Sequence, residues 1–334
     1  MSNTLFKLKI GMTYDLRNDY LKEGYTHEET AEFDLPDTIE AIEKVIIDSG
    51  YQACRIGNIK ALTHRLAAGE RWDLVFNIAE GISGFGREAQ VPALLEAYNI
   101  PYTFSDPLGL ALTLHKGMTK HIISDLDIPT PDFTVIQHEE DIAGVRLPFP
   151  LFAKPVAEGT GKGITALSKI NTGEELNLIC TSLLKAFRQP VLLETYLPGR
   201  EFTVGILGTG KNARALGAME VILLPAAEKN AYSYDNKENY ENLVQYVLVN
   251  DDEARLAMEI SLAAWRGLDL KDAGRVDLRS DASGMPNFME VNALAGLNPV
   301  RSDLPILCNM LDINYSKLIN SIIESALQRA EINK

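Results

Sequence analysis

The sequence predicts an α+β protein built in three sections, with a small open parallel sheet in the first. The first third alternates strand-like apolar runs with helical patterns, which is typical of βαβ units. The remaining two thirds carry strand-like runs joined by polar or glycine-rich turns, which favours hairpins. The length of 334 residues fits two or three domains.

The first section, residues 1–110, is predicted to hold the parallel sheet. Isoleucines recur at helical spacing after Pro36, and Gly50 is a suitable helix stop. A second helix is expected around residues 93–98. The acidic stretch at residues 19–37 has little apolar periodicity, so we interpret it as an excursion from this section, for which a solvated loop is the simplest account. The expected strands are residues 7–12, 51–56, 73–78 and 100–104.

The second section, residues 111–198, and the third, residues 199–334, are predicted to combine strands with longer helices. One long helix is expected to begin near Asp106 and to run to about Leu126. A polar loop, YSYDNKENYEN, interrupts the last section. The other expected helices are residues 173–187 and 251–267 and the C-terminal segment. The expected strands are residues 151–155, 164–167, 191–194, 201–207, 218–223, 275–278 and 287–292.

The composition excludes several classes of protein. A hydrophobic fraction of 46% and a charged fraction of 23% are those of an ordinary globular protein. The formal net charge of -14 disfavours nucleic acid as a partner. The sequence contains no apolar run of the roughly 20 residues that a membrane helix needs and no signal peptide, so no membrane partner is expected. The 3 widely spaced cysteines fit a reducing cytoplasm, where we expect the protein to lie.

The segment LFAKPVAEGTGKGI is a candidate phosphate site. Its glycines allow backbone N–H groups to approach phosphate oxygens, although a plain glycine-rich hairpin would show the same pattern. It is not a P-loop, because Lys162 is followed by Gly163 instead of Ser or Thr. Lys154 ends an apolar strand, so it needs an anion, either a phosphate or a nearby carboxylate.

The strongest local pattern is GRVDLRSDASGMPNFMEVNALAGLNP. Arg275 and Asp277 are two apart on one predicted strand, and Glu290 and Asn292 are two apart on the next. Alternate strand residues share a face, so all four side chains can converge, although a surface hairpin with outward charges would fit the same spacing. Two carboxylates and an amide oxygen suit Mg²⁺, with two ions expected and Mn²⁺ also compatible. Arg275 would neutralise developing negative charge.

Two further segments are suggestive. In VLLETYLPGREFTVGIL, a connector between two predicted sheets carries Glu194, Leu197 and Glu201, which could read an adenine edge and ribose hydroxyls. Arg87 and Glu88 in the first section are either substrate contacts or a helix N-terminal pair. The histidines have no metal-ligand spacing.

Together, the series AKP, EGTGKG, ETYLPGRE, RVD, MEVN and AGLNP resembles the ATP-grasp superfamily, and within it the D-alanine–D-alanine ligases. The resemblance covers most of the chain, from VFNIAEG to the C-terminal helices. It implies an ATP-grasp fold with ATP between the last two sections. Residues 1–110 would be the N-terminal pre-ATP-grasp domain, residues 111–198 the small subdomain with the glycine-rich loop, and residues 199–334 the domain with the metal site.

The resemblance also implies roles for individual residues. Arg275 and the amide of Gly296 match the oxyanion stabilisers, Lys237 matches a basic residue over the γ-phosphate, and Ser302 matches a contact to the carboxylate of the second substrate. The metal ligands are matched by Asp277, Glu290 and Asn292. The nucleotide contacts are matched by Lys116, Lys154, Glu158, Gly159, Thr160, Gly161, Gly163, Glu194, Leu197 and Glu201.

Departures from the family pattern fall on the substrate side. A glutamate that orients the first substrate's amine is replaced by the shorter Asp15, and a histidine before the first-domain glycine is replaced by Glu80. We therefore expect an ATP-dependent carboxylate–amine ligase with an altered substrate site, acting on a small amino-acid-like or peptide-like acid and amine. Dimers are common in this family, so a homodimer is possible in principle. The alternatives are a non-catalytic ATP sensor and a kinase that stops at phosphorylation.

Overall fold

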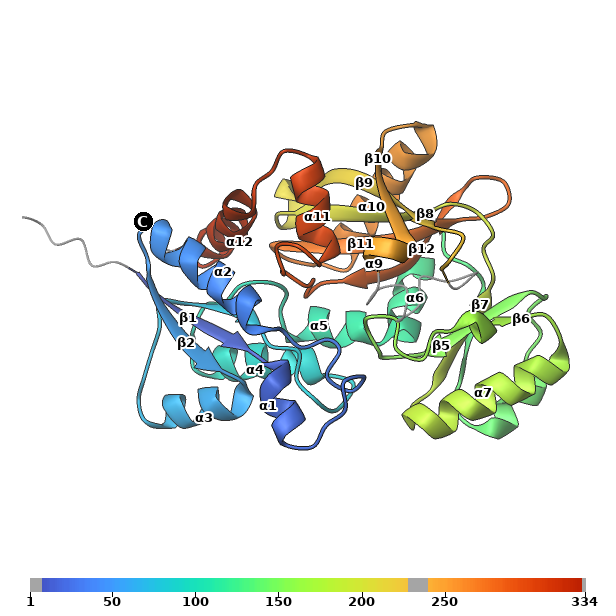
Figure 1. The fold of residues 1–334 in the computed structure, drawn as a ribbon, viewed down its shortest axis with the longest axis horizontal. Coiled ribbons are helices and arrows are strands. Elements are labelled where there is room, and N and C mark those ends of the chain that lie inside the picture. Colours follow the sequence, from blue (N-terminus) through green and yellow to red (C-terminus); the bar gives the residue numbers. More distant parts are fainter. Residues whose placement is uncertain (1–7, 228–239, 332–334) are drawn as a thin grey trace, which may run out of the picture.

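The protein consists of three sections, each built on its own sheet, in the part of the chain described by a computed structural model, residues 8–227 and 240–331. Figure 1 shows the N-terminal section, coloured blue, beside the C-terminal section, coloured orange and red. The middle section, coloured green, lies beside the C-terminal section and extends away from the N-terminal sheet. Among the described residues, no helix is long and apolar enough to cross a membrane.

The N-terminal sheet is parallel, as predicted, with strand order β2-β1-β3. Its strands β1 (Lys9–Tyr14), β2 (Gln52–Gly57) and β3 (Leu74–Ile78) lie within two residues of the expected positions. The strand expected at residues 100–104 is wrong, because only Tyr102 forms a bridge, to Val75, and Phe104 turns the chain with a positive φ of 71°. The helices of this section are α1 (Arg17–Lys22), α2 (Pro36–Asp48), α3 (Ile59–Ala67), η1 (Arg87–Ala89) and α4 (Gln90–Ala97).

The acidic excursion is a folded segment and not a plain solvated loop. Tyr20 and Phe33 are buried, with their ring centroids 4.5 Å apart. Arg17 donates hydrogen bonds to the carbonyls of Thr30 (3.1 Å) and Ala31 (2.6 Å), which closes the segment on α1. The sequence did not reveal this because the buried contacts come from isolated residues with no regular period.

The single long helix expected at residues 106–126 is also wrong. The chain forms α5 (Pro107–Leu114) and α6 (Lys116–Asp125), separated at His115, whose ψ of 86° leaves the helical range. The N–H of Lys116 bonds to the carbonyl of Val156 (3.0 Å) instead of to the preceding turn. The break therefore docks the start of α6 against the chain that follows β5 (Leu151–Pro155).

The middle sheet is antiparallel, with order β4-β7-β5-β6. The predicted strands at 151–155 and 191–194 and the helix at 173–187 are confirmed. The strand expected at residues 164–167 is wrong, because Thr165 caps a 3₁₀ turn there and pairing begins only at Lys169. The elements not yet named are β4 (Phe133–Ile136), η2 (Glu139–Gly144), η3 (Ala166–Ser168), β6 (Lys169–Ile170), α7 (Gly173–Phe187) and β7 (Val191–Thr195).

The C-terminal sheet is antiparallel, with order β10-β9-β8-β11-β12. The predicted helix at residues 251–267 is confirmed, since Asp251 caps α10 by accepting a hydrogen bond from the N–H of Ala254. Most of the polar loop, including Lys237, lies outside the described residues. The elements are β8 (Glu201–Leu207), η4 (Gly210–Asn212), β9 (Arg214–Leu223), α9 (Tyr240–Leu243), β10 (Val244–Val249), α10 (Asp252–Gly267), β11 (Ala273–Ser280), β12 (Pro286–Asn292), α11 (Asp303–Met310) and α12 (Tyr315–Arg329).

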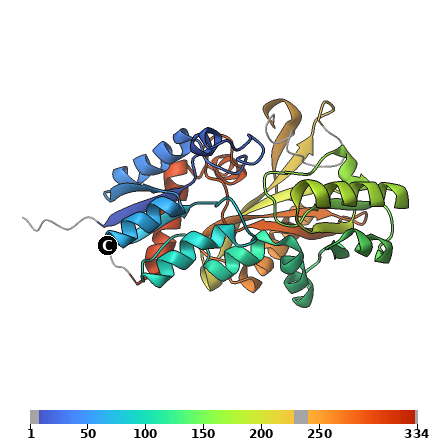
Figure 2. The same ribbon diagram turned by 90° about the horizontal axis from the view of Figure 1, so that it is seen from below.

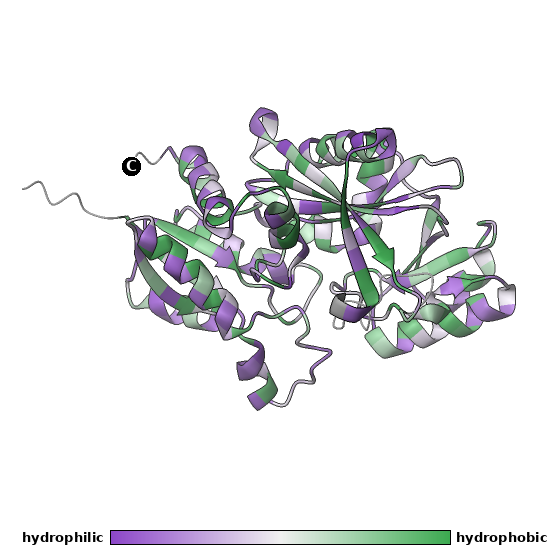
Figure 3. Ribbon diagram, turned by 45° about the horizontal axis from the view of Figure 1, so that its top comes forward, coloured by the Kyte–Doolittle hydropathy of each residue, from purple (hydrophilic) through white to green (hydrophobic). Residues whose placement is uncertain are grey.

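One hydrophobic core joins the N-terminal and C-terminal sections. The last helix, α12, lies beside α2, as the views in Figures 1 and 2 both show. Arg329 at its end forms an ion pair with the fully buried Asp272 (2.8 Å) and donates to the carbonyl of Tyr102 (2.9 Å). The middle section has its own core between its sheet and α7. Figure 3 shows α7 with a mixture of apolar and polar residues, as expected for a helix with one buried side.

Candidate active site

The late hairpin brings its polar side chains together as predicted. In the register of β11 and β12, Asp277 pairs directly with Glu290, and Arg275 pairs directly with Asn292. Directly opposed residues of an antiparallel pair lie on the same face. The carboxylate of Asp277 accepts hydrogen bonds from Arg275 (2.6 and 2.8 Å), from Thr203 (2.8 Å) and from the amide of Asn292 (3.3 Å). The hairpin belongs to a five-stranded sheet and is not an isolated surface feature.

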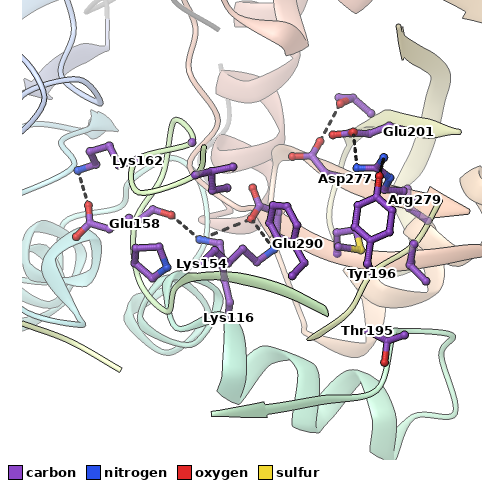
Figure 4. Close-up of a pocket in the computed structure, with 18 residues that line it drawn as sticks. Lys116, Lys154, Glu158, Lys162, Thr195, Tyr196, Glu201, Asp277, Arg279 and Glu290 are labelled. Atoms are coloured by element: carbon purple, nitrogen blue, oxygen red, sulfur yellow. Dashed lines mark hydrogen bonds and ion pairs between the residues drawn. The ribbon is translucent and has the colours of Figure 1, made fainter. Parts of the chain in front are cut away.

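Two buried lysines approach Glu290 from other elements. The Nζ of Lys116, at the start of α6, lies 3.6 Å from the Glu290 carboxylate, and the Nζ of Lys154, on β5, lies 3.8 Å from it. Figure 4 shows both side chains directed toward Glu290. The lysine that ends a middle-section strand therefore faces the late hairpin. From the sequence, either a phosphate or a carboxylate could have been the anion beside Lys154. A carboxylate is present, because the Nζ of Lys154 lies 3.1 Å from Glu194.

An elongated cavity, which we call the inter-sheet cavity, lies between the middle and C-terminal sheets. One end is lined by apolar and aromatic side chains, among them Phe152, Tyr196, Leu197, Leu278 and Met289. The other end is lined by charged groups, among them Lys116, Lys154, Glu158, Lys162, Asp277 and Glu290. Glu201 lines the same cavity and lies 3.5 Å from Arg279. An apolar lining next to buried cations and carboxylates suits a nucleobase followed by phosphates.

Glu194 does not line the inter-sheet cavity. Its side chain is fully buried and forms ion pairs with Lys154 and with Lys120 (2.9 Å). Although burial opposes ionisation, the two lysines hold the pKa of Glu194 below its usual range. Its expected role as a reader of adenine therefore stays a prediction. Lys120 was not predicted, although its position one turn after Lys116 places both on one face of α6.

The glycine-rich loop lies over the charged end of this cavity. Glu158, Gly161 and Lys162 line it, and the Nζ of Lys116 donates to the carbonyl of Glu158 (2.5 Å). Thr160 has a positive φ of 53°, and the flanking glycines at 161 and 163 adopt positive φ as well. The loop reverses direction through these residues, which is the conformation in which glycine is favoured.

A second cavity, which we call the central cavity, adjoins the first. Lys116, Glu158 and Glu290 line both cavities. The other groups that line the central cavity come from all three sections of the fold and include Glu32, Glu80, Glu88, Gly159, Thr160, Arg275, Asn292 and Gly296. It therefore connects the charged end of the inter-sheet cavity with groups of the N-terminal section.

Glu80 and Glu88 give the central cavity an acidic wall. Burial raises the pKa of Glu80 well above its usual value, and the neighbouring Glu88 raises it further. Burial raises the pKa of Glu88 to about 7. Neither carboxylate forms a hydrogen bond or an ion pair with a protein group in the described part of the chain. Arg87 lowers the pKa of both carboxyl groups, but burial outweighs it, so a further positive charge would stabilise their ionised forms and this wall favours a cationic ligand.

Asp15 and Ser302 lie beside the central cavity. Asp15 is buried, and its carboxylate accepts hydrogen bonds from Tyr20 and from the N–H of Gly81 (2.9 Å). A direct substrate contact for Asp15 stays a prediction, since both oxygens are bonded to the protein here. The hydroxyl of Ser302 accepts from the N–H of Asn298 (3.0 Å) and would lie 2.8 Å from a Cβ at Gly296, so this close approach requires glycine. Arg275, Gly296 and Ser302 line a third cavity.

The oxygen ligands fit a divalent cation only in combination with a substrate. No group of three or more His, Cys, Asp or Glu side chains in the described residues could hold a metal ion alone. Asp277 and Glu290 are opposed, and the Asn292 amide lies beside Asp277 through its nitrogen, which leaves its oxygen available. Mg²⁺ commonly takes one or two carboxylates and completes its shell with phosphate oxygens and water. This set meets that requirement.

Comparisons with known proteins agree with this geometry. Residues 122–324 match the model of a protein family described as the D-ala D-ala ligase C-terminus. A D-alanine–D-alanine ligase from Aquifex aeolicus is 32% identical over 288 residues, which cover 86% of this chain and 93% of that protein. An uncharacterised protein, y4sG, from Sinorhizobium fredii is 32% identical over 266 residues, 77% of this chain and 75% of that protein.

Solved structures show the same fold. The structure of a D-alanine–D-alanine ligase from Bacillus anthracis, complexed with ATP, superposes with a TM-score of 0.73 at 22% identity and covers 97% of this chain and 98% of that chain. The fold is thus that of an ATP-grasp ligase. The chain belongs to the D-alanine–D-alanine ligase family.

Proposed function

We propose that this protein is an ATP-dependent ligase that activates a carboxylate as an acyl phosphate and joins it to an amine. The observation that carries the proposal is the approach of two lysines from the middle section, Lys116 and Lys154, to Glu290, which is directly opposed to Asp277. These groups line one cavity together with apolar and aromatic side chains. Cations that face acidic metal ligands across a cleft are the arrangement that phosphoryl transfer needs.

In this proposal ATP lies in the inter-sheet cavity. The adenine lies against Leu197 and its apolar neighbours, Glu201 binds the ribose, and Lys116 and Lys154 hold the phosphates. The glycine-rich loop, residues 158–163, covers them, and Lys237 of the polar loop supplies a further cation. Asp277, Glu290 and Asn292 hold Mg²⁺, which neutralises charge on the phosphates when it is bound. In this placement, residues 111–198 and 199–334 form the two domains that enclose ATP, and residues 1–110 form the domain that precedes them.

Each step then has its own residues. The carboxylate of the first substrate attacks the γ-phosphorus in line, ADP leaves, and Lys154 disperses the negative charge. The amine of the second substrate attacks the acyl carbon and loses a proton as phosphate leaves. Arg275 and the amide of Gly296, which line the central cavity, stabilise the tetrahedral oxyanion. Ser302 binds the carboxylate of the second substrate.

The substrate site differs from that of a D-alanine ligase. Burial outweighs the nearby Arg87 at both Glu80 and Glu88 of the central cavity, so these carboxylates favour a first substrate whose amine or other positive group points toward them. The carboxylate of Asp15 accepts a hydrogen bond from the N–H of Gly81, the residue after Glu80, and so holds the backbone that carries Glu80. The substrates are a small acid and a small amine of amino-acid or peptide type.

A phosphate-release screen over pairs of amino acids and dipeptides tests this proposal, with ATP and Mg²⁺ present and Asp277→Asn as the blank. The expected result is release above the blank for a limited set of pairs, with a product whose mass contains both substrates. A product that contains one substrate plus phosphate would indicate a kinase. ATP binding without turnover for any pair would indicate a non-catalytic sensor. Either result would overturn the ligase proposal.

A further inference from the structure

The acidic excursion places one carboxylate, that of Glu32, against the glycine-rich loop. The residues on either side of Glu32, Ala31 and Phe33, are buried, and Arg17 holds the carbonyl of Ala31. The backbone at Glu32 is therefore fixed from both sides. Figure 1 shows the blue loop after α1 extending toward the loop that follows β5.

The Glu32 carboxylate is an acceptor for three groups around the loop. It accepts a hydrogen bond from the N–H of Gly159 (2.5 Å), and it forms ion pairs with Arg87 (2.9 Å) and Lys162 (3.3 Å). Its side chain is only 9% exposed. Burial opposes ionisation, but Arg87 and Lys162 hold the pKa of Glu32 below its usual range, so the carboxylate is charged. Charge-assisted bonds of this kind are the strong ones.

Gly159 makes this contact possible. A Cβ at residue 159 would lie 2.3 Å from the Oε1 of Glu32, so any side chain there would displace the carboxylate from this position. The same contact holds further parts of the loop. Arg87 donates to the carbonyl of Ala157 (2.9 Å), and Lys162 forms a second ion pair with Glu158 (2.5 Å), which Figure 4 also shows.

The loop held in this way separates solvent from the place where the reaction would occur. Gly159 and Thr160 line the central cavity together with Arg275 and Gly296, and Glu32 lines it too. Lys162 and Glu158, from the same loop, line both the inter-sheet cavity and a cavity that opens toward the excursion. Movement of this loop away from Glu32 would therefore join the central cavity to the outer one.

We propose that Glu32 is a positioning residue that keeps the glycine-rich loop closed over the reacting groups, so that the acyl phosphate meets the amine and not water. This inference rests on the proposed ligase function. With the loop closed, the acyl carbon–nitrogen bond forms, the acyl carbon–phosphate oxygen bond breaks, and one amide is made for each phosphate. With the loop released, water attacks instead and returns the free carboxylate and phosphate, so ATP is consumed without product.

The first test needs no substrate. Hydrogen exchange of the backbone amides of residues 156–165 is measured in the full-length protein without ligand, for wild type, Glu32→Ala and Glu28→Ala. Glu28 lies in the same excursion but is exposed, so Glu28→Ala is the matched control. Exchange at Gly159 is expected to accelerate at least tenfold in Glu32→Ala and to stay unchanged in Glu28→Ala. Equal exchange in all three proteins would show that Glu32 does not hold the loop.

The second test measures coupling. For the acid–amine pair that the screen identifies, beginning with D-alanine as both acid and amine, the ratio of phosphate released to condensed product is measured. Wild type and Glu28→Ala are expected to give a ratio near 1, and Glu32→Ala a ratio several-fold higher with a KM for ATP changed less than about twofold. If turnover fell with the ratio unchanged, Glu32 would have only a structural role, and the proposal would be wrong.

A second variant keeps the test decisive if Glu32→Ala folds poorly. Gly159→Ala leaves every residue of the excursion in place, and its added methyl group displaces the Glu32 carboxylate from the N–H of residue 159. It is expected to raise both the exchange rate and the phosphate-to-product ratio, as Glu32→Ala does. If no pair gives a condensed product, the ligase function fails and the coupling role fails with it. The exchange result then still decides whether Glu32 holds the loop, so the two failures are distinguishable.

Discussion

Replacing Glu194 by glutamine is expected to destabilise the ligand-free protein by about 3 kcal/mol. Glu194 is fully buried and lies between two lysines, 2.9 Å from Lys120 and 3.1 Å from Lys154. Removing one member of a buried ion pair costs about 3–5 kcal/mol, because the remaining charge is left without a partner. The lower end applies here, because the glutamine oxygen can still accept one hydrogen bond.

The sign of the pH dependence follows from the lysines. Burial lowers the pKa of Lys120 to about 8, whereas the carboxylates of Glu194 and Glu290 outweigh burial at Lys154 and raise its pKa. Without Glu194, Lys120 binds its proton less tightly still in the folded state, while in the unfolded state its pKa is about 10.4. A base whose folded pKa is depressed destabilises the fold while it is protonated. The stability of the variant is therefore expected to rise with pH between the folded-state and unfolded-state pKa values of Lys120, and more steeply than that of wild type.

Urea unfolding followed by circular dichroism, without nucleotide, measures the effect. With a slope of about 3 kcal/mol per molar urea, a loss of about 3 kcal/mol lowers the midpoint by about 1 M. Glu201→Gln is the control, because the Glu201 side chain is 24% exposed and lies 3.5 Å from Arg279, so about 1 kcal/mol or less is expected. If Glu194→Gln cost no more than this control, the carboxylate would not be what stabilises the two lysines, and the reasoning would be refuted.

Two further predictions concern the acidic wall of the central cavity. Glu80→Gln is expected to raise the KM for the amine-bearing acid about tenfold or more, while the KM for ATP changes less than about twofold. Steady-state kinetics with each substrate varied separately measures the two KM values. Equal effects on the two KM values would contradict a substrate role for Glu80. Burial raises the pKa of Glu88 to about 7, and the charged groups around its carboxyl are Arg87, Glu32, Lys116 and Glu80. The carboxyl therefore loses its proton as pH rises through 7, and the KM for the amine-bearing acid should fall between pH 6 and 8. Glu88→Gln should flatten this pH dependence.

The hairpin that carries the candidate metal ligands was predictable because it depends only on a local rule. Residues two apart on a strand share a face, so the spacing of Arg275 from Asp277 and of Glu290 from Asn292 predicts one polar surface. The direct pairing of Asp277 with Glu290 confirms this. The strand that ends near Lys154 was predictable for the same reason, since a buried apolar run identifies it.

The contacts between sections were not predictable, because they depend on how separate elements pack. Lys120 and Glu194 are 74 positions apart in the sequence, and neither position has a pattern that predicts a fully buried ion pair. Glu32 lies in a segment without periodicity, and its contact with Gly159 spans 127 positions. The break between α5 and α6 at His115 depends on a bond from Lys116 to Val156 in another section, so local helix propensity could not indicate it.

The two adjoining cavities have opposite charge preferences, and this difference constrains how a substrate would lie. At the shared boundary, Lys116 approaches Glu290, and Lys154 of the inter-sheet cavity approaches both Glu290 and Glu194. Together with Lys120, these lysines outnumber the two glutamates that they contact, so the charged end can accept further negative charge. On the far wall of the central cavity, burial outweighs the attraction of the nearby Arg87 and keeps the pKa values of Glu80 and Glu88 raised. A zwitterionic acid therefore has one favourable orientation, with its carboxylate toward the lysines and its positive group toward the glutamates. That orientation presents the carboxylate to the γ-phosphate of an ATP bound in the inter-sheet cavity, whereas an acid without a positive group gains nothing from the acidic wall and pays to approach it.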